Sequence, residues 1–219
     1  MHDQGRLHQA RAGRRQATTP WQCIPEMTVR QRLPRSSRRR KATESETLPH
    51  VHDGLEPEGG PELRSDAISL EAAIAMTGIS KRTLWRRVSD GTIAKHKEDA
   101  RGRAMLAFAQ IVGLIKLELS DEDLHMIVKA DSGDANAQAD VGGMFFVAGH
   151  FDAAVYWFDL AAAQGNADAM QWLGNCHASG LGVPKDDSLA IMWIAKAASL
   201  GHPVACQQIQ GMRAGCGEP

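Results

Sequence analysis

The carboxyl-terminal half of the chain repeats itself, and this periodicity constrains the fold most strongly. The stretch "GDANAQADVG" (133–142) aligns with "GNADAMQWLG" (165–174) at an offset of 32 residues. The stretch "AVYWFDLAAAQG" (154–165) aligns with "AIMWIAKAASLG" (190–201) at an offset of 36 residues, and a third copy begins at Gly201. Such a period is typical of stacked helical hairpins, because each hairpin buries its apolar side only against its neighbours. The sequence therefore predicts a short α-solenoid.

Residues of the same kind recur where helices must approach closely or where a gap must be filled. The recurring pairs are Gly142 and Gly174, Ala154 and Ala190, Ala161 and Ala197, and Trp157 and Trp193. These features resemble the Sel-one-like repeat, a relative of the tetratricopeptide repeat, over about residues 132–216. The second copy is the more complete; its matching residues are Ala169, Leu173, Gly174, Gly180, Gly182, Val183, Asp186, Ala190, Trp193, Lys196, Ala197, Ala198 and Gly201. The resemblance implies a concave surface that binds a protein or peptide.

A second pattern lies further toward the amino terminus, in "SLEAAIAMTGISKRTLWRRVSDGTI" (69–93). Ser69 and Ser80 are each placed to cap a short helix, and Gly78 between them suits a tight turn. Leu84 and Val88, one turn apart, would be buried. Two short helices joined at a glycine turn predict a helix-turn-helix.

The stretch after Gly91 predicts a wing and then further helices. "TIAKHKEDARGRAMLAF" (92–108) has the pattern of two short strands around the polar tip "EDARGR". A helix is expected over "FAQIVGLIKLEL" (108–119), and another over "DEDLHMIVKAD" (121–131), which Ser120 and Asp123 would open with a capping box. We expect these helices to cap the repeats and join them to the helix-turn-helix.

The helix-turn-helix resembles the winged form found in MerR-type regulators and phage excisionases, over about residues 68–108. The matching residues are Ala72, Ala73, Gly78, Ile79, Ser80, Thr83, Leu84, Trp85, Arg86 and Gly91. Arg87 departs from the pattern, since the family often has an aromatic or apolar residue there. No long heptad pattern follows the wing, so the minimal, excisionase-like form is the closer match.

The basic residues of this region suit contacts with double-stranded DNA. Arg82 and Arg86 lie four residues apart and so share a helical face, and an arginine fork can bond guanine in the major groove. The wing residues would reach phosphates. The predicted DNA contacts are Ser80, Lys81, Arg82, Thr83, Arg86, Arg87, Lys95, Lys97, Arg101 and Arg103. The alternative is a solvated cationic helix that only packs Leu84, Trp85 and Val88 into a small core.

Charge is unevenly distributed along the chain, although the net charge is −1. Residues 1–67 hold 12 Lys+Arg and 9 Asp+Glu, with 11 of the basic residues before Ala42. Residues 68–118 hold 9 basic and 5 acidic residues, and residues 119–219 hold 4 and 12. The basic and then acidic composition of residues 1–66 predicts a disordered tail, and Met27 is an alternative start. Segregated charge of this kind indicates different partners for different parts.

Neither an enzyme nor a metal protein is indicated. Cys176, Cys206 and Cys216 fit no zinc spacing, and the first two fall in repeat helices where a buried thiol is expected. The "HVHD" stretch (50–53) lies in the predicted tail, and "GLGVPKDD" (180–187) lacks the ending of a phosphate-binding loop. No cofactor is expected. The absence of a long apolar run or signal peptide favours a cytoplasmic protein with no membrane partner.

The sequence therefore predicts a mainly α chain in four parts. These are a disordered tail (1–66), a winged helix-turn-helix (67–108), connecting helices (109–131) and Sel-one-like repeats (132–219). The leading hypothesis is a nucleoid-associated transcriptional regulator that binds double-stranded DNA and, through its repeats, an unidentified protein; a homodimer would strengthen DNA binding. The alternatives are a scaffold that does not bind DNA and an excisionase-like factor that bends it.

Overall fold

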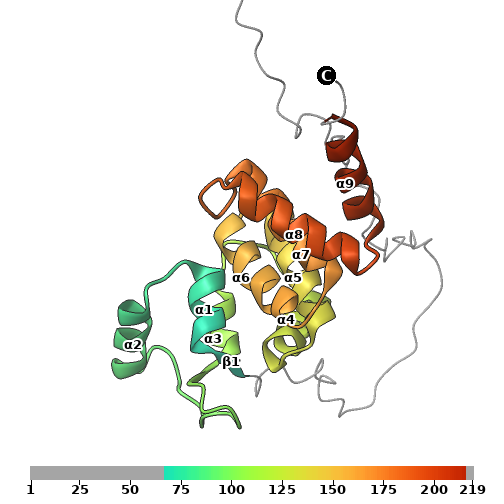
Figure 1. The fold of residues 1–219 in the computed structure, drawn as a ribbon. Coiled ribbons are helices and arrows are strands. Elements are labelled where there is room, and N and C mark those ends of the chain that lie inside the picture. Colours follow the sequence, from blue (N-terminus) through green and yellow to red (C-terminus); the bar gives the residue numbers. More distant parts are fainter. Residues whose placement is uncertain (1–66, 216–219) are drawn as a thin grey trace, which may run out of the picture.

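The computed structural model describes residues 67–215, so the predicted tail, the "HVHD" stretch and Cys216 lie outside the described residues. Within this range the chain is almost entirely helical and divides visually into a small amino-terminal unit and a stack of antiparallel helices (Figure 1). None of the described helices combines the length and the apolar character that crossing a bilayer requires.

The amino-terminal unit begins with strand β1 (Ala67–Ser69), helix α1 (Leu70–Thr77) and helix α2 (Lys81–Ser89). Both predicted caps are confirmed: the Ser69 hydroxyl accepts from the Ala72 amide, and the Ser80 hydroxyl accepts from the Thr83 amide. Gly78 ends α1 with a φ of 66°, a conformation that glycine adopts without strain.

A short hairpin follows α2, but of the two predicted strands only the second is formed; the first is reduced to a single bridge at Lys95, and the second has an additional partner. The Ala107 amide donates to the Ala94 carbonyl, and the His96 amide donates to the Met105 carbonyl. Strand β2 (Met105–Ala107) also pairs antiparallel with β1, with Ile68 opposite Leu106. Strand β1 was not predicted, because a three-residue strand is too short to produce a periodic signal.

The predicted helix over residues 108–119 is much shorter in the structure. Helix α3 (Phe108–Val112) ends at Gly113, and the chain then continues in turns. Glycine is a poor helix former, and the irregular stretch after it places Ile115 in the core with 8% of its surface exposed. The apolar residues that suggested a long helix are therefore buried from a turn.

Helix α4 (Asp121–Ser132) matches its prediction closely. The Ser120 hydroxyl accepts from the Asp123 amide, and the Asp123 carboxylate accepts from the Ser120 amide, which completes the capping box. Aspartate therefore replaces the usual glutamate here without loss of the reciprocal bonds. Because α4 contacts both β1 and α5, it joins the amino-terminal unit to the stack.

Five helices of similar length make up the stack; they are α5 (Ala135–Val147), α6 (Phe151–Ala163), α7 (Ala167–Ser179), α8 (Asp187–Ser199) and α9 (Pro203–Gly215). The helices α5 and α6 form one hairpin and α7 and α8 the next, while α9 projects beyond α8 at the far end (Figure 1). Asp134, Asn166 and Asp186 cap three of these helices through their side-chain oxygens. The predicted solenoid of helical hairpins is confirmed.

The recurring small residues lie where the two helices of a hairpin touch. A methyl group at Gly142 would fall 2.6 Å from the Phe158 ring, and one at Gly174 would overlap the Ile194 side chain. The recurring tryptophans are less alike: Trp157 is fully buried, whereas Trp193 is half-buried with the Lys196 ammonium 4.4 Å from its ring centroid. Trp157 lies in the middle of the stack, whereas Trp193 lies nearer its end.

Gly142 provides a test of this close approach. We expect Gly142→Ala to lower the free energy of unfolding by about 1–3 kcal/mol, because the added methyl group overpacks the contact with Phe158. Gly143→Ala is the matched control in the same helix, since a methyl group there meets no atom within 4 Å. The control should be neutral or stabilising by up to about 1 kcal/mol. Urea unfolding measures both variants, and equal stabilities would contradict the close-packing argument.

Candidate functional site

Helix α2 lies at the periphery of the molecule and packs mainly on α1 (Figure 1). Leu84 is fully buried, whereas Val88 is only half-buried, so the second predicted core position is less enclosed than expected. Ser80 and Thr83 are bonded to each other through the cap, with their hydroxyl oxygens 3.0 Å apart. Within the described residues, Lys81, Arg82, Arg86 and Ser89 of α2 remain exposed.

The basic side chains of α2 face outward. Lys81, Arg82 and Arg86 are exposed and Arg87 is half-buried, and none of the four forms an ion pair with a residue in the 67–215 range. Arg82 and Arg86 flank a shallow hollow of about 320 Å³. Within residues 67–215, the guanidinium groups of α2 are thus not folded against the acidic repeats.

The hairpin brings two more predicted residues near this helix. Lys95 and Lys97 are exposed, and the Lys95 ammonium lies 5.4 Å from the centre of the Trp85 ring. Because Trp85 belongs to α2, this cation–π contact places the start of the hairpin beside the helix. Lys95 also approaches Glu98 at 3.9 Å, an exposed ion pair of little energetic weight.

Arg101 and Arg103 are placed differently from their prediction, because both turn toward the end of α4. The Arg101 guanidinium donates to the Ser132 carbonyl at 3.0 Å while remaining exposed. Arg103 bonds Asp99 at 2.7 Å and Asp131 at 2.8 Å, so its guanidinium is not available to a phosphate. Arg103 is a structural residue in this fold, and we leave it out of the candidate DNA contacts.

Asp131 is the centre of a junction that sequence inspection did not find. Its carboxylate is 3% exposed and accepts from the Ser69 amide, the Ser69 hydroxyl and Arg103. Burial alone lowers the pKa of Arg103, but the bonds to Asp99 and Asp131 outweigh burial and raise it above its ordinary value. Nearby, burial and then the charge of Asp131 raise the pKa of Tyr156 on α6 to about 12.

The stack carries a crowded acidic surface on α5 and α7. Burial, followed by the charges of Asp168 and Asp134, raises the pKa of Asp140 above its ordinary value. Asp168 itself is in contact with His202, whose Nε2 lies 2.9 Å from the Asp168 carboxylate. We call Asp134, Asp140 and Asp168 the acidic repeat surface.

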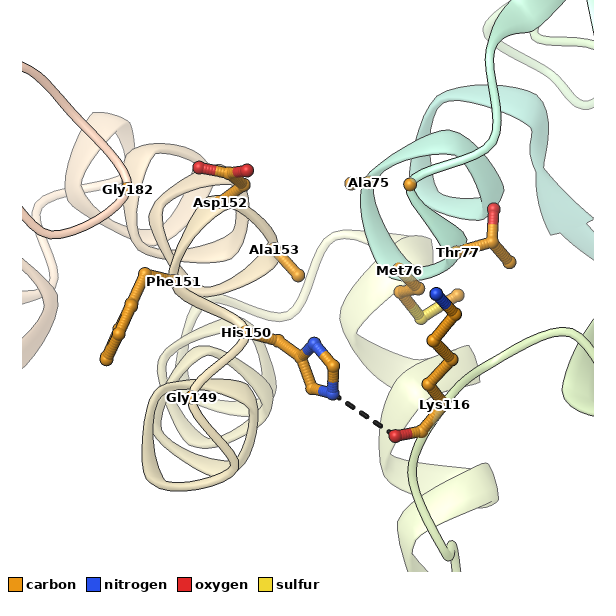
Figure 2. A pocket seen from close by; sticks show the side chains of 11 residues that line it. Ala75, Met76, Thr77, Lys116, Gly149, His150, Phe151, Asp152, Ala153 and Gly182 are labelled. Carbon is orange, nitrogen blue, oxygen red and sulfur yellow. Dashed lines mark hydrogen bonds between the residues drawn. The ribbon is translucent and has the colours of Figure 1, made fainter.

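A cleft of about 340 Å³ separates the end of α1 from the start of α6 (Figure 2). His150 is the N-cap residue of α6, but its side chain makes no capping bond. Instead its ring points toward Lys116, and its Nε2 lies 3.2 Å from the Lys116 carbonyl (Figure 2). Met76 and Thr77 line the opposite wall. The Thr77 hydroxyl donates to the Ala73 carbonyl of its own helix.

Cys176 and Cys206, the two cysteines within residues 67–215, both lie in helices of the stack. Cys176 is fully buried in α7, and burial raises the pKa of its thiol to about 12, so it is a protonated packing residue at neutral pH. Cys206 in α9 is half-buried, less than expected, and its thiol lies 3.5 Å from the Ala198 carbonyl. Among residues 67–215 no three His, Cys, Asp or Glu side chains come together where they would hold a metal ion.

The helical stack is similar to a known family of repeats. The family model of the Sel1 repeat matches residues 135–166 and 167–202, which correspond to the hairpins α5–α6 and α7–α8. Residues 135–202 are two Sel1 repeats. The predicted Sel-one-like repeats are therefore confirmed, whereas their binding of a protein and the likeness of residues 68–108 to MerR-type regulators and excisionases remain predictions.

Two individual proteins are similar to part of the chain. The DAP3-binding cell death enhancer 1 of Rattus norvegicus is 36% identical over 83 residues, which are 37% of this chain and 16% of the rat protein. A crystal structure of a Sel1 repeat protein from Oxalobacter formigenes is 34% identical and covers 48% of this chain and 33% of the other, with a TM-score of 0.39. The chain thus spans only a small part of the rat protein's length.

The contribution of the Asp131 junction to stability can be tested by substitution. We expect Asp131→Asn to lower the free energy of unfolding by about 2–4 kcal/mol, because it leaves Arg103 without its buried counter-charge. Asp187→Asn is the control, since it breaks an exposed ion pair with Lys185 at 3.8 Å and should cost less than about 1 kcal/mol. Chemical denaturation of both variants measures the difference, and similar small losses would show that the junction is not a stabilising element.

Proposed function

We propose that this protein is a non-enzymatic interaction protein whose Sel1 repeats bind a basic segment of a protein partner. The proposal depends chiefly on the acidic repeat surface, where the charges of Asp134, the N-cap of α5, and of Asp168 on α7 act on Asp140, with Lys129 offsetting part of this effect. A cationic partner would relieve this repulsion, and like charges held close together by the fold favour such a partner electrostatically. Residues 119–219 contain 12 acidic and 4 basic residues, and this excess of negative charge also favours a positively charged partner.

The repeat stack also offers apolar surface on its outer helix. Leu189 and Leu200 of the α8 region are 38% and 55% exposed, and Trp193 lies between them on the same helical face. Interfaces commonly combine such aliphatic and aromatic anchors with charged surroundings. We therefore expect an amphipathic basic segment, rather than a purely charged one, to be the preferred partner.

Charge removal at the acidic repeat surface tests this proposal. We expect Asp140→Asn with Asp168→Asn to reduce partner capture by tenfold or more, about 1.4 kcal/mol, because two carboxylates that would attract a basic segment are lost. The control is Asp152→Asn with Asp187→Asn, which removes the same charge from the first turns of α6 and α8. The loss is measured by quantitative affinity capture with the full chain. Each protein is then titrated with a synthetic basic amphipathic peptide and with a control peptide in which acidic residues replace the basic ones. Equal capture by both double variants would contradict the proposal.

The Asp140 substitution should not impair folding. The folded state raises the pKa of Asp140, so the charged form destabilises the fold above that pKa and the protonated form does not. Asp140→Asn should therefore be at least as stable as the parent chain at pH 7, with the difference shrinking as the pH falls through the folded pKa and disappearing below the pKa of the unfolded chain. Thermal melts of the variant and the parent chain, at pH 7 and at an acidic pH below the unfolded pKa, separate a loss of binding from a loss of structure.

Nucleic-acid binding is the second candidate function, and the exposure of Lys81, Arg82 and Arg86 on a protruding helix favours it. On this proposal α2 enters the major groove of double-stranded DNA, while Lys95 and Lys97 meet phosphates. The protein would then link DNA to the partner of its repeats as a cytoplasmic, nucleoid-associated regulator. Dimerisation would provide the additional contacts that a single small module lacks.

The arginines of α2 test this second proposal. If both contact phosphates, Arg82→Ala with Arg86→Ala should make the log–log salt slope of DNA binding shallower by about 1.8, since each phosphate contributes about 0.9. Lys129→Ala with Lys185→Ala is the charge-matched control on the other half of the chain and should leave the slope unchanged. Band shifts of the full chain at several salt concentrations provide the slopes. Identical slopes for the two variants would exclude α2 as the DNA contact.

A further inference from the structure

The exposed cations of α2 and the hairpin form one surface without an acidic partner from another element of the described chain. We call Lys81, Arg82, Arg86, Lys95 and Lys97 the basic face. Its single ion pair within residues 67–215 joins Lys95 to Glu98 at 3.9 Å, and Glu98 belongs to the same hairpin. The stack cannot neutralise this face, because α2 projects away from it (Figure 1).

The chain itself provides a segment of opposite charge next to this surface. Residues 44–66 contain seven carboxylates (Glu44, Glu46, Asp53, Glu56, Glu58, Glu62 and Asp66) and one basic residue, Arg64. This acidic segment joins the fold at Ala67, the first residue of β1, and β1 pairs with the strand that returns from the hairpin bearing Lys95 and Lys97. The acidic segment is thus tethered at the base of the unit that carries the basic face.

Length and tethering favour an intramolecular contact. Twenty-three residues extend to at most about 80 Å, which is ample for a segment attached to the same small unit. A tether of this kind gives an effective concentration in the millimolar range, so that weak charge pairs suffice for substantial occupancy. An untethered anion would have to compete against that local concentration.

We propose that the acidic segment 44–66 docks on the basic face of its own chain and competes there with nucleic-acid phosphates. The competition rests on the proposed nucleic-acid role of α2, whereas the docking does not. The contact is electrostatic, so it weakens when salt screens the charges. DNA binding by the intact chain is then weaker than the exposed arginines alone would produce.

Lysine labelling of the full-length chain tests the docking without DNA. An acetylating reagent at low salt, with mass-spectrometric detection, reports the reactivity of Lys81 and Lys97. In the variant E56Q/E58Q/E62Q these two lysines should react about threefold faster than in the parent chain, because part of the covering charge is gone. Lys129 and Lys185, 64% and 52% exposed on the other half of the molecule, should not change.

A matched variant controls for net charge: D140N/D152N/D159N removes three carboxylates from α5 and α6 and should leave Lys81 and Lys97 unchanged. Equal reactivity in all three proteins would overturn the docking. Protection that rises with protein concentration would also overturn it, by assigning the face to a second copy. Band shifts with duplex DNA then separate the docking from the competition. If E56Q/E58Q/E62Q labels faster and also binds DNA more tightly than the parent chain, both the docking and the competition are supported. If it labels faster but neither protein binds DNA, the docking is retained and the competition is rejected.

Discussion

The buried carboxylate of Asp131 is the interaction on which the arrangement of the molecule depends. It joins Ser69, 62 residues earlier, and Arg103, 28 residues earlier, to the end of α4. A carboxylate that is almost fully enclosed is tolerated only when donors replace the lost water, and here an amide, a hydroxyl and a guanidinium do so. Since α4 also packs on α5, this junction ties the amino-terminal unit to the first repeat.

The same junction decides which cations remain available. Arg103 is used to hold β1 and the hairpin on α4, and Arg101 reaches a carbonyl at the same helix end. The cations of α2 have no such partner among the described elements, because the helix projects away from the stack. A basic surface at one end and an acidic one on the repeats are therefore kept apart by the fold.

The Sel1 repeats owe their geometry to small residues rather than to large cores. Gly142 admits the ring of Phe158 and Gly174 admits Ile194, so that each hairpin closes tightly. Toward the end of the stack fewer helices provide cover, which leaves Trp193 half-exposed and Leu200 mostly exposed. The surfaces offered to partners follow from where stacking begins and stops.

Local signals in the sequence were sufficient for much of the fold. The helical repeat, the caps at Ser69, Ser80 and Ser120, and the burial of Leu84 and Cys176 all depend on neighbours within a few residues or on a repeated pattern. The helix expected over residues 108–119 failed because tertiary burial of Ile115 from a turn imitates a helical pattern. Such burial is invisible to periodicity alone.

The sequence by itself determined that the chain contains helical-hairpin repeats, and it singled out the basic residues of α2. Only the tertiary structure decided that Arg103 serves the junction, that Asp131 is its acceptor and that Asp140 is crowded by Asp168. The physical reason is range: a cap or a repeat is fixed by contacts a few residues away, whereas the environment of a charged side chain is set by residues distant in the sequence that folding brings within a few ångströms.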